Sequence, residues 1–168
     1  MFQHVRLVLA LVAAAALAGC EFNRFGGRSP DESAVSAEDW VEGASPVAVA
    51  DLEALWDRSK DVLANAGFAI DEQRTRYADR IIATRWNTML SPQRFEGRRL
   101  RIWVRMQESG AGRWLVAAAV QGQRNVDIDH PSEPAGAKWE DIASDKARAD
   151  VILYMIESGF REPGAATK

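Results

Sequence analysis

The chain has 168 residues, of which 21 are basic and 24 are acidic, so its formal net charge is −3. This mildly acidic balance argues against non-specific nucleic-acid binding, which needs a basic surface, and we expect no nucleic-acid partner. Cys20 is the only cysteine, so intramolecular disulfides are excluded. A fold in an oxidising compartment therefore has to be stabilised by packing alone.

The first twenty residues have the three parts of an export signal. Arg6 supplies positive charge, residues 7–16 are mostly apolar, and small residues lead to Cys20 in the run Leu17-Ala18-Gly19-Cys20. This run resembles the lipobox of bacterial lipoprotein precursors. The resemblance implies that residues 1–19 are cleaved, that Cys20 becomes the first residue, and that it carries a covalent lipid. We expect no other cofactor.

Two other interpretations of this segment stay open. Ala16-Leu17-Ala18 also fits an A-x-A cleavage site, which would release a soluble protein with a free thiol. An uncut helix is the other, although the apolar run falls short of the ~20 residues that span a bilayer. In lipoproteins an aspartate after the lipidated cysteine favours inner-membrane retention. Because Glu21 stands there, the resemblance favours the outer membrane, with the domain facing the periplasm.

The mature chain is predicted to hold one domain behind a tether. Residues 20–45 are rich in glycine, serine and acidic residues without a periodic apolar pattern, which predicts a lipidated flexible tether. Residues 46–162 are expected to form a single α+β domain, and residues 163–168 a disordered tail. Trp40 is the exception in the tether, and we expect it to dock on the domain rather than rest at the membrane interface.

The apolar pattern predicts helices at both ends of a set of strands. Asp51 is a good N-cap for the first helix, and Gly67 is expected to end it in a left-handed conformation. Ser144 is the expected cap of the last helix, and Gly159-Phe160 is expected to repeat the exit at Gly67. The predicted elements are a short strand at 47–50, a helix at 51–66, strands at 68–70, 79–86, 99–106 and 113–123, and a helix at 144–158 with an apolar stripe at Val151, Ile152, Met155 and Ile156.

This order predicts a two-layer α+β sandwich, in which an antiparallel meander of about four strands is flanked by an N-terminal and a C-terminal helix. The loop at 87–97 is expected to cover one end of the sheet, or to form a lip that docks a partner. Residues 51–86 resemble the opening of the helix-grip domains in the accessory C lipoprotein of the outer-membrane barrel-assembly machinery. The segments that carry the resemblance are Leu55-Trp56, Val62-Leu63, Gly67-Phe68-Ala69-Ile70 and Asp79-Arg80-Ile81-Ile82-Ala83-Thr84-Arg85-Trp86. It implies a helix-grip-like fold, an envelope location and no catalytic residues.

The predicted strand at 99–106 is the best candidate for a binding surface. Apolar residues alternate there with arginines and a tryptophan, so one face is expected to pack and the other to face solvent. Guanidinium groups beside an indole bind phosphate, carboxylate or sugar, although arginines on an exposed strand also serve simply to keep it soluble. The candidate ligand-binding residues, including two that extend this face if the neighbouring strands pair as expected, are Arg99, Arg101, Trp103, Arg105, Arg85 and Arg113.

The sequence offers few residues that could form a catalytic site. His130 is the only histidine after the export signal, and it lies near Asp127, Asp129 and Glu133. Carboxylates and an imidazole suit a divalent cation, but their spacing matches no calcium loop, and we expect no bound metal.

Three functions follow from these features, in order of preference. The first is a non-enzymatic, membrane-anchored accessory or scaffold domain that binds another envelope component. The second is binding of a cell-wall glycan or of an anionic ligand, such as a lipid headgroup, through the arginine-bearing strand face. The third is a metal-dependent hydrolase at Asp127, Asp129 and His130.

Overall fold

The computed structural model describes residues 35–49, 51–91, 96–127 and 137–160. Cys20 and the predicted tail at 163–168 lie outside these residues. The elements in chain order are η2 (Ala37–Asp39), β1 (Val41–Glu42), β2 (Val47–Ala48), α1 (Leu52–Asn65), β3 (Ile81–Ala83), β4 (Asn87–Ser91), β5 (Glu96–Gly110), β6 (Arg113–Asn125), β7 (Trp139–Ile142) and α2 (Lys146–Ser158). The strands form one antiparallel sheet beside two α-helices, which confirms the predicted α+β class.

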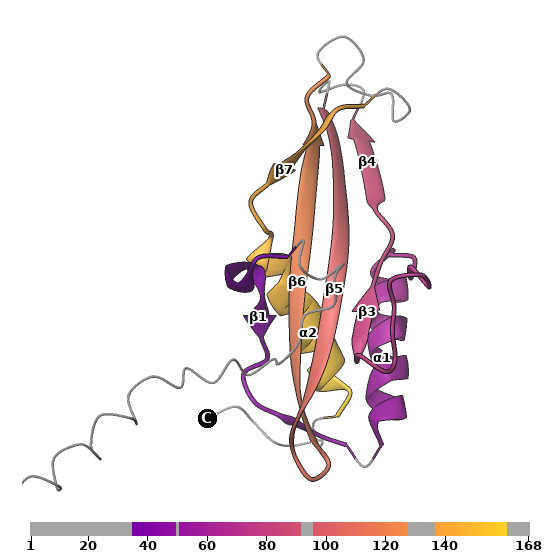
Figure 1. The fold of residues 1–168 in the computed structure, drawn as a ribbon, viewed down its shortest axis with the longest axis vertical. Coiled ribbons are helices and arrows are strands. Elements are labelled where there is room, and N and C mark those ends of the chain that lie inside the picture. Colours follow the sequence, from indigo (N-terminus) through magenta and orange to yellow (C-terminus); the bar gives the residue numbers. More distant parts are fainter. Residues whose placement is uncertain (1–34, 50, 92–95, 128–136, 161–168) are drawn as a thin grey trace, which may run out of the picture.

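The long hairpin of β5 and β6 forms the centre of the sheet (Figure 1). The strands β1, β2 and β7 all pair with β6, while β3 and β4 pair with β5. The sheet is therefore four strands wide along its length, and its edge strands are built from short pieces. Sequence patterning missed β1, β4 and β7 because two to five residues carry too little periodicity. The prediction that residues 87–97 form a loop was wrong for residues 87–91, which form β4.

One face of the sheet packs against both helices. Inward side chains of β5 and β6 form the main core with the buried sides of α1 and α2, as the alternation in the sequence predicted. The helices are also joined directly, since Nη2 of Arg58 donates a hydrogen bond to the carbonyl of Met155 at 3.0 Å. Figure 1 shows that the helices lie beside one half of the hairpin, and that β4 and β7 flank the other half. The hairpin thus extends beyond the helix layer as an arm.

The first helix begins and ends as predicted. The Asp51 side chain accepts a hydrogen bond from the backbone N–H of Glu53 at 3.0 Å, which satisfies one of the free donors at the helix start. Gly67 has a φ of 84°, a left-handed conformation that glycine adopts without steric cost, and Phe68 behind it is buried. Local sequence chemistry is sufficient to set this element.

The second helix differs from its prediction in three respects. Asp145, not Ser144, is the N-cap, because its side chain accepts from the backbone N–H of Arg148 while the Ser144 hydroxyl donates to the Val120 carbonyl. Gly159 has a φ of −69°, so the exit does not repeat the one at Gly67. Val151, expected in the buried stripe, is 56 % exposed. The buried residues of α2 are Ala149, Ile152, Leu153, Ile156 and Glu157.

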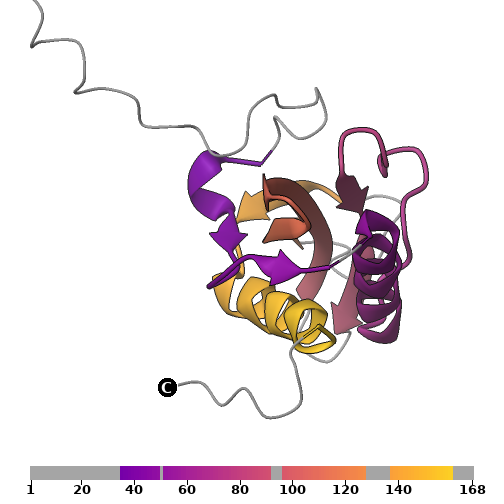
Figure 2. The ribbon, with the colours of Figure 1, turned by 90° about the horizontal axis from the view of Figure 1, so that it is seen from below.

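The fold begins earlier than the predicted domain boundary at residue 46. Val35 is fully buried, and β1 pairs with Ala117 and Ala118 of β6. Trp40 packs against the sheet, which confirms that it docks on the domain. The C-terminal part of the predicted tether at 20–45 is therefore part of the folded unit. In the end-on view of Figure 2, η2 lies apart from the two helices.

A register shift separates β3 from β4 along the edge of β5. Thr84 bonds to Ile102 through both backbone and hydroxyl, whereas Asn87 pairs with Leu100. Two residues, Arg85 and Trp86, therefore stand opposite the single residue Arg101, as in a β-bulge. The bulge exchanges the two faces for every residue that follows it in the edge strand.

Among the described residues, no helix is long and apolar enough to cross a membrane.

Candidate functional site

A row of alternating arginines and tryptophans lies on the face of β5 opposite the helices. The guanidinium of Arg99 lies 4.4 Å from the ring centre of Trp139 and 4.7 Å from that of Trp86. The guanidinium of Arg101 lies 4.6 Å from Trp86 and 4.9 Å from Trp103. Each such contact contributes about 0.5–1 kcal/mol at a partly exposed site. Adding the contact of Arg105 over Trp40 at 4.1 Å completes what we call the Arg/Trp row: Trp139, Arg99, Trp86, Arg101, Trp103, Arg105 and Trp40.

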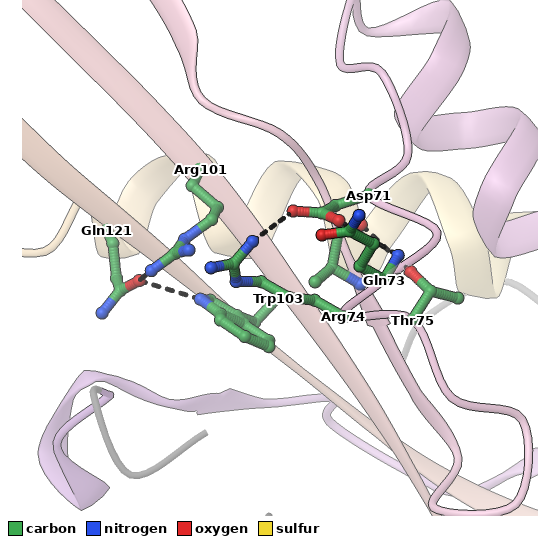
Figure 3. A network of polar contacts seen from close by, with 8 residues as sticks. Asp71, Gln73, Arg74, Thr75, Arg101, Trp103 and Gln121 are labelled. Atoms are coloured by element: carbon green, nitrogen blue, oxygen red, sulfur yellow. Dashed lines mark hydrogen bonds and ion pairs between the residues drawn. The ribbon is translucent and has the colours of Figure 1, made fainter. Parts of the chain in front are cut away.

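Gln121 of β6 holds the middle of the Arg/Trp row in place (Figure 3). Its side-chain oxygen accepts from Nε and Nη2 of Arg101 at 3.2 and 2.8 Å, and from Nε1 of Trp103 at 2.8 Å. Gln121 is the direct cross-strand partner of Arg101, so the alternation of the sheet brings the two side chains to the same face. One amide therefore fixes the orientation of a guanidinium and of an indole.

Gln123 fixes the outer end of the row in the same way. Its oxygen accepts from Nε of Arg99 at 2.7 Å, and its Nε2 donates to the carboxylate of Asp141 at 2.7 Å. Among the described residues, no group accepts a hydrogen bond from the two terminal amino groups of Arg99. Burial lowers the pKa of Arg99, while the charge of Asp141 acts in the opposite direction. Arg99 thus offers oriented, unused donors to a ligand.

The prediction that the arginine-bearing face of β5 is open to solvent was wrong at Trp103. Its side chain is fully buried in a second apolar cluster. The cover comes from the N-terminal segment, because Val35 and Trp40 pack against this side of the sheet. The cluster also includes Ile81, Ala83 and Ala119. Of the six candidate ligand-binding residues, Trp103 is therefore a structural support rather than a contact surface.

The structure brings Arg99, Arg101 and Arg105 together, but it does not join Arg85 or Arg113 to them. Because of the bulge, Trp86 rather than Arg85 takes the place beside Arg101, and Arg85 is exposed. Arg113 is exposed at the start of β6, eight residues from Gln121, which is about 26 Å along the strand. Arg85 is therefore not part of the Arg/Trp row, and Arg113 lies on β6 beyond its inner end.

Sequence reasoning missed the aromatic and amide partners of the arginines. The parity of β6 places Gln121 and Gln123 on the arginine side, which was a usable signal. The position of Trp86 beside the arginines depends on the bulge, and that of Trp139 depends on the short strand β7. Neither position could therefore be predicted from the periodicity of apolar residues. Trp40 lies far from β5 in the sequence, and only tertiary packing brings it to Arg105.

A second polar network covers the edge of β3 beside the row (Figure 3). Asp71 forms an ion pair with Arg74 at 2.8 Å and accepts from the backbone N–H of Gln73. Burial alone would raise the pKa of Asp71, but the hydrogen bond and charge of Arg74, together with backbone N–H donors, lower it below its ordinary value. Thr75 bonds with both backbone groups of Ala83. This network closes the sheet edge, which is a structural task.

The proposed metal cluster is only partly within the described chain. Asp127 follows the end of β6, where its backbone N–H donates to the Asn125 side chain. Asp129, His130 and Glu133 lie outside the described residues. Within the described part of the chain, no group of three histidine, cysteine, aspartate or glutamate side chains is arranged to hold a metal ion.

The geometry of the Arg/Trp row is suited to holding an anionic group. The planar guanidinium of Arg99, stacked on indoles, presents its terminal amino edge for paired hydrogen bonds to the oxygens of a phosphate or carboxylate. Comparison with known proteins gives no family: no family model matches the chain, and no curated protein matches it either.

Proposed function

We propose that the protein is a lipid-anchored component of the bacterial envelope whose single domain binds another envelope component without catalysis. The observation that carries this proposal is the run Leu17-Ala18-Gly19-Cys20 placed close to the start of the fold. Only 14 residues separate Cys20 from Val35, which is the first described residue and is already buried. The anchor and the domain are therefore close neighbours along the chain.

The length of the connection limits where the domain works. Fifteen residue steps span at most about 50 Å when fully extended. A domain held within that distance of a bilayer meets partners at a high effective concentration, so weak binding is sufficient. Two acyl chains are enough for stable membrane attachment. This arrangement suits an accessory or scaffold domain that acts at the membrane surface.

The side chains of the domain also favour binding over chemistry. The arginines of the Arg/Trp row are held by glutamines and indoles, and Asp141, the carboxylate near Arg99, is itself held by a hydrogen bond from Gln123. Held side chains lose little conformational freedom when a ligand arrives, which favours affinity. We therefore propose a non-enzymatic role.

Mass spectrometry of the protein isolated from membranes tests the anchor. We expect a chain that begins at Cys20, with diacylglycerol on its sulfur and an acyl group on its new amino terminus. The control is Cys20→Ser, which should leave the membrane fraction or remain unprocessed. A chain cut after Ala18, recovered as a soluble protein with a free thiol, would contradict the proposal and support the A-x-A interpretation.

Crosslinking in intact cells tests the binding role. A photoreactive residue at Thr88 reports on the Arg/Trp face, since Thr88 is exposed and pairs with Arg99. The same group at Asp150, which is exposed on α2, is the matched control. We expect a defined crosslinked species from position 88 that is weaker or absent from position 150. Equal, diffuse crosslinking from both positions would contradict a dedicated binding face.

A further inference from the structure

The Arg/Trp row lies on the face of the sheet where the anchor segment enters the fold. Val35 and Trp40 pack against this face, and Val35 belongs to the same buried cluster as Trp103. The indole Nε1 of Trp103 bonds to the amide that also holds Arg101. The chain that leads from Cys20 therefore joins the domain beside the arginines. The helices lie on the other face.

The charge of this face is mainly positive. Arg99, Arg101 and Arg105 share it, and each is only half buried. Two acidic groups share it: Asp141 at the outer end, which accepts a hydrogen bond from Gln123 and lies near Arg99, and exposed Glu42 of β1, which is in register with Arg105 through Ala117. The face thus complements an anionic surface, although the protein as a whole carries a net negative charge.

We propose that the Arg/Trp row binds the phosphates of anionic phospholipid headgroups in the membrane that holds the lipid anchor. This inference rests on the anchor of the proposed function and names the component that the domain binds. The terminal amino groups of Arg99 supply paired donors to a headgroup phosphate, and Arg101 lies beside them on the same strand. Partly exposed Trp86 and Trp139 suit the interface between headgroups and acyl chains. The domain would then lie with its helices away from the bilayer.

Reconstitution of the acylated protein tests this inference. Vesicles of phosphatidylcholine alone are compared with vesicles that also contain phosphatidylglycerol, and docking is measured as protection of tryptophan emission from acrylamide. We expect protection only with phosphatidylglycerol, and its loss at high salt. Arg99→Gln and Arg101→Gln should each lower the docking equilibrium constant about fivefold, the usual effect of one basic residue near an anionic surface.

Two further variants separate the row from general charge effects. Arg113→Gln removes the same charge from an exposed site about 26 Å along β6 from Gln121, far from Arg99 and Arg101, and we expect a change of less than about twofold. Asp141→Asn removes the acidic group beside Arg99, and we expect it to strengthen docking. Equal docking on both vesicle types, or equal losses for Arg99→Gln and Arg113→Gln, would overturn the inference.

The source of the phosphate is decided with soluble probes. Inorganic phosphate and glycerol phosphate are added to the acylated protein on phosphatidylcholine vesicles. Protection by these ions without a response to phosphatidylglycerol would overturn a membrane ligand in favour of a soluble one. Mass spectrometry of the same sample separates the two proposals. A chain without acyl groups contradicts both, whereas an acylated chain that ignores phosphatidylglycerol contradicts only this one.

Discussion

The two faces of β5 are both covered, but by different means. On one face Leu100, Ile102 and Val104 belong to a large apolar cluster with two helices. On the other face a thin N-terminal segment buries Trp103, while arginines stacked on indoles take the remaining places. The helical face is a core whose function is stability. The arginine face combines a small core with oriented polar groups, and it is the face suited to binding.

The largest test of this comparison is to delete a large side chain from the arginine face. Trp103→Ala is expected to lower the free energy of unfolding by about 3–5 kcal/mol, because it leaves a cavity and removes the indole hydrogen bond to Gln121. The matched substitution in the helical core is Leu63→Ala, for which about 2–5 kcal/mol is expected. Denaturant titration measures both. A loss below 1 kcal/mol for Trp103→Ala would show that the second cluster is not a core.

The close approach of β7 to the hairpin gives the next effect. A Cβ atom at Gly122 would lie 2.8 Å from Ile142 and 3.2 Å from Leu100, so Gly122→Ala should cost about 1–3 kcal/mol through overpacking. The expected consequence is a weakened β7 that releases Trp139 from Arg99. Hydrogen exchange of the backbone of residues 139–142 is the measurement, and unchanged protection would contradict the close packing.

Substituting Gln121 and Gln123 compares the buried part of the arginine face with its exposed part, because Gln121 bonds to buried Trp103 and Gln123 bonds to half-buried Arg99. Gln121→Leu is expected to cost about 1–3 kcal/mol, because the indole N–H of buried Trp103 loses its acceptor. Gln123→Leu should cost less than about 1 kcal/mol, since half-buried Arg99 can be hydrated instead. Thermal unfolding of both variants checks the ranking. Equal losses would mean that the two glutamines support the sheet in the same way.

The smallest effect is the pH dependence of Asp71 at the sheet edge. Because the pKa of Asp71 is lower in the fold than in the unfolded chain, its contribution is complete above the unfolded pKa and lost as pH falls through the folded pKa. The difference in unfolding free energy between the protein and Asp71→Asn should therefore be largest near neutral pH, at about 0.2–1 kcal/mol, and shrink below pH ~4. A difference that grows on acidification would contradict this sign.

Local chemistry in the sequence was enough to predict that two helices and the long hairpin form, although the cap, the exit and part of the buried stripe of α2 were wrong. Capping by Asp51, the turn at Gly67 and the alternation along β5 and β6 each depend on neighbouring residues alone. The same alternation predicted an exposed Trp103, and this was wrong because the cover comes from residue 35 and residue 40, far away in the sequence. Periodicity reports which residues share a face, but not what packs on it.

The sequence predicted only those residues of the candidate site that share one strand. The alternation places Arg99, Arg101 and Arg105 together because they lie on one strand. Trp86 joins them through a one-residue bulge, which exchanges it with Arg85 and has no signature in the apolar pattern. Partners that arise from register or from distant packing need the three-dimensional structure.

The orientation of the two faces toward the membrane is the central claim, and thiol labelling measures it directly. Because Cys20 is the only cysteine and is expected to be acylated, a cysteine introduced elsewhere is the only reactive thiol. Thr88→Cys marks the arginine face and Asp150→Cys marks α2, and both sites are exposed. On anionic vesicles we predict that a charged maleimide labels position 88 much more slowly than position 150, and that high salt removes the difference. Equal rates on anionic vesicles at low salt would contradict the claim.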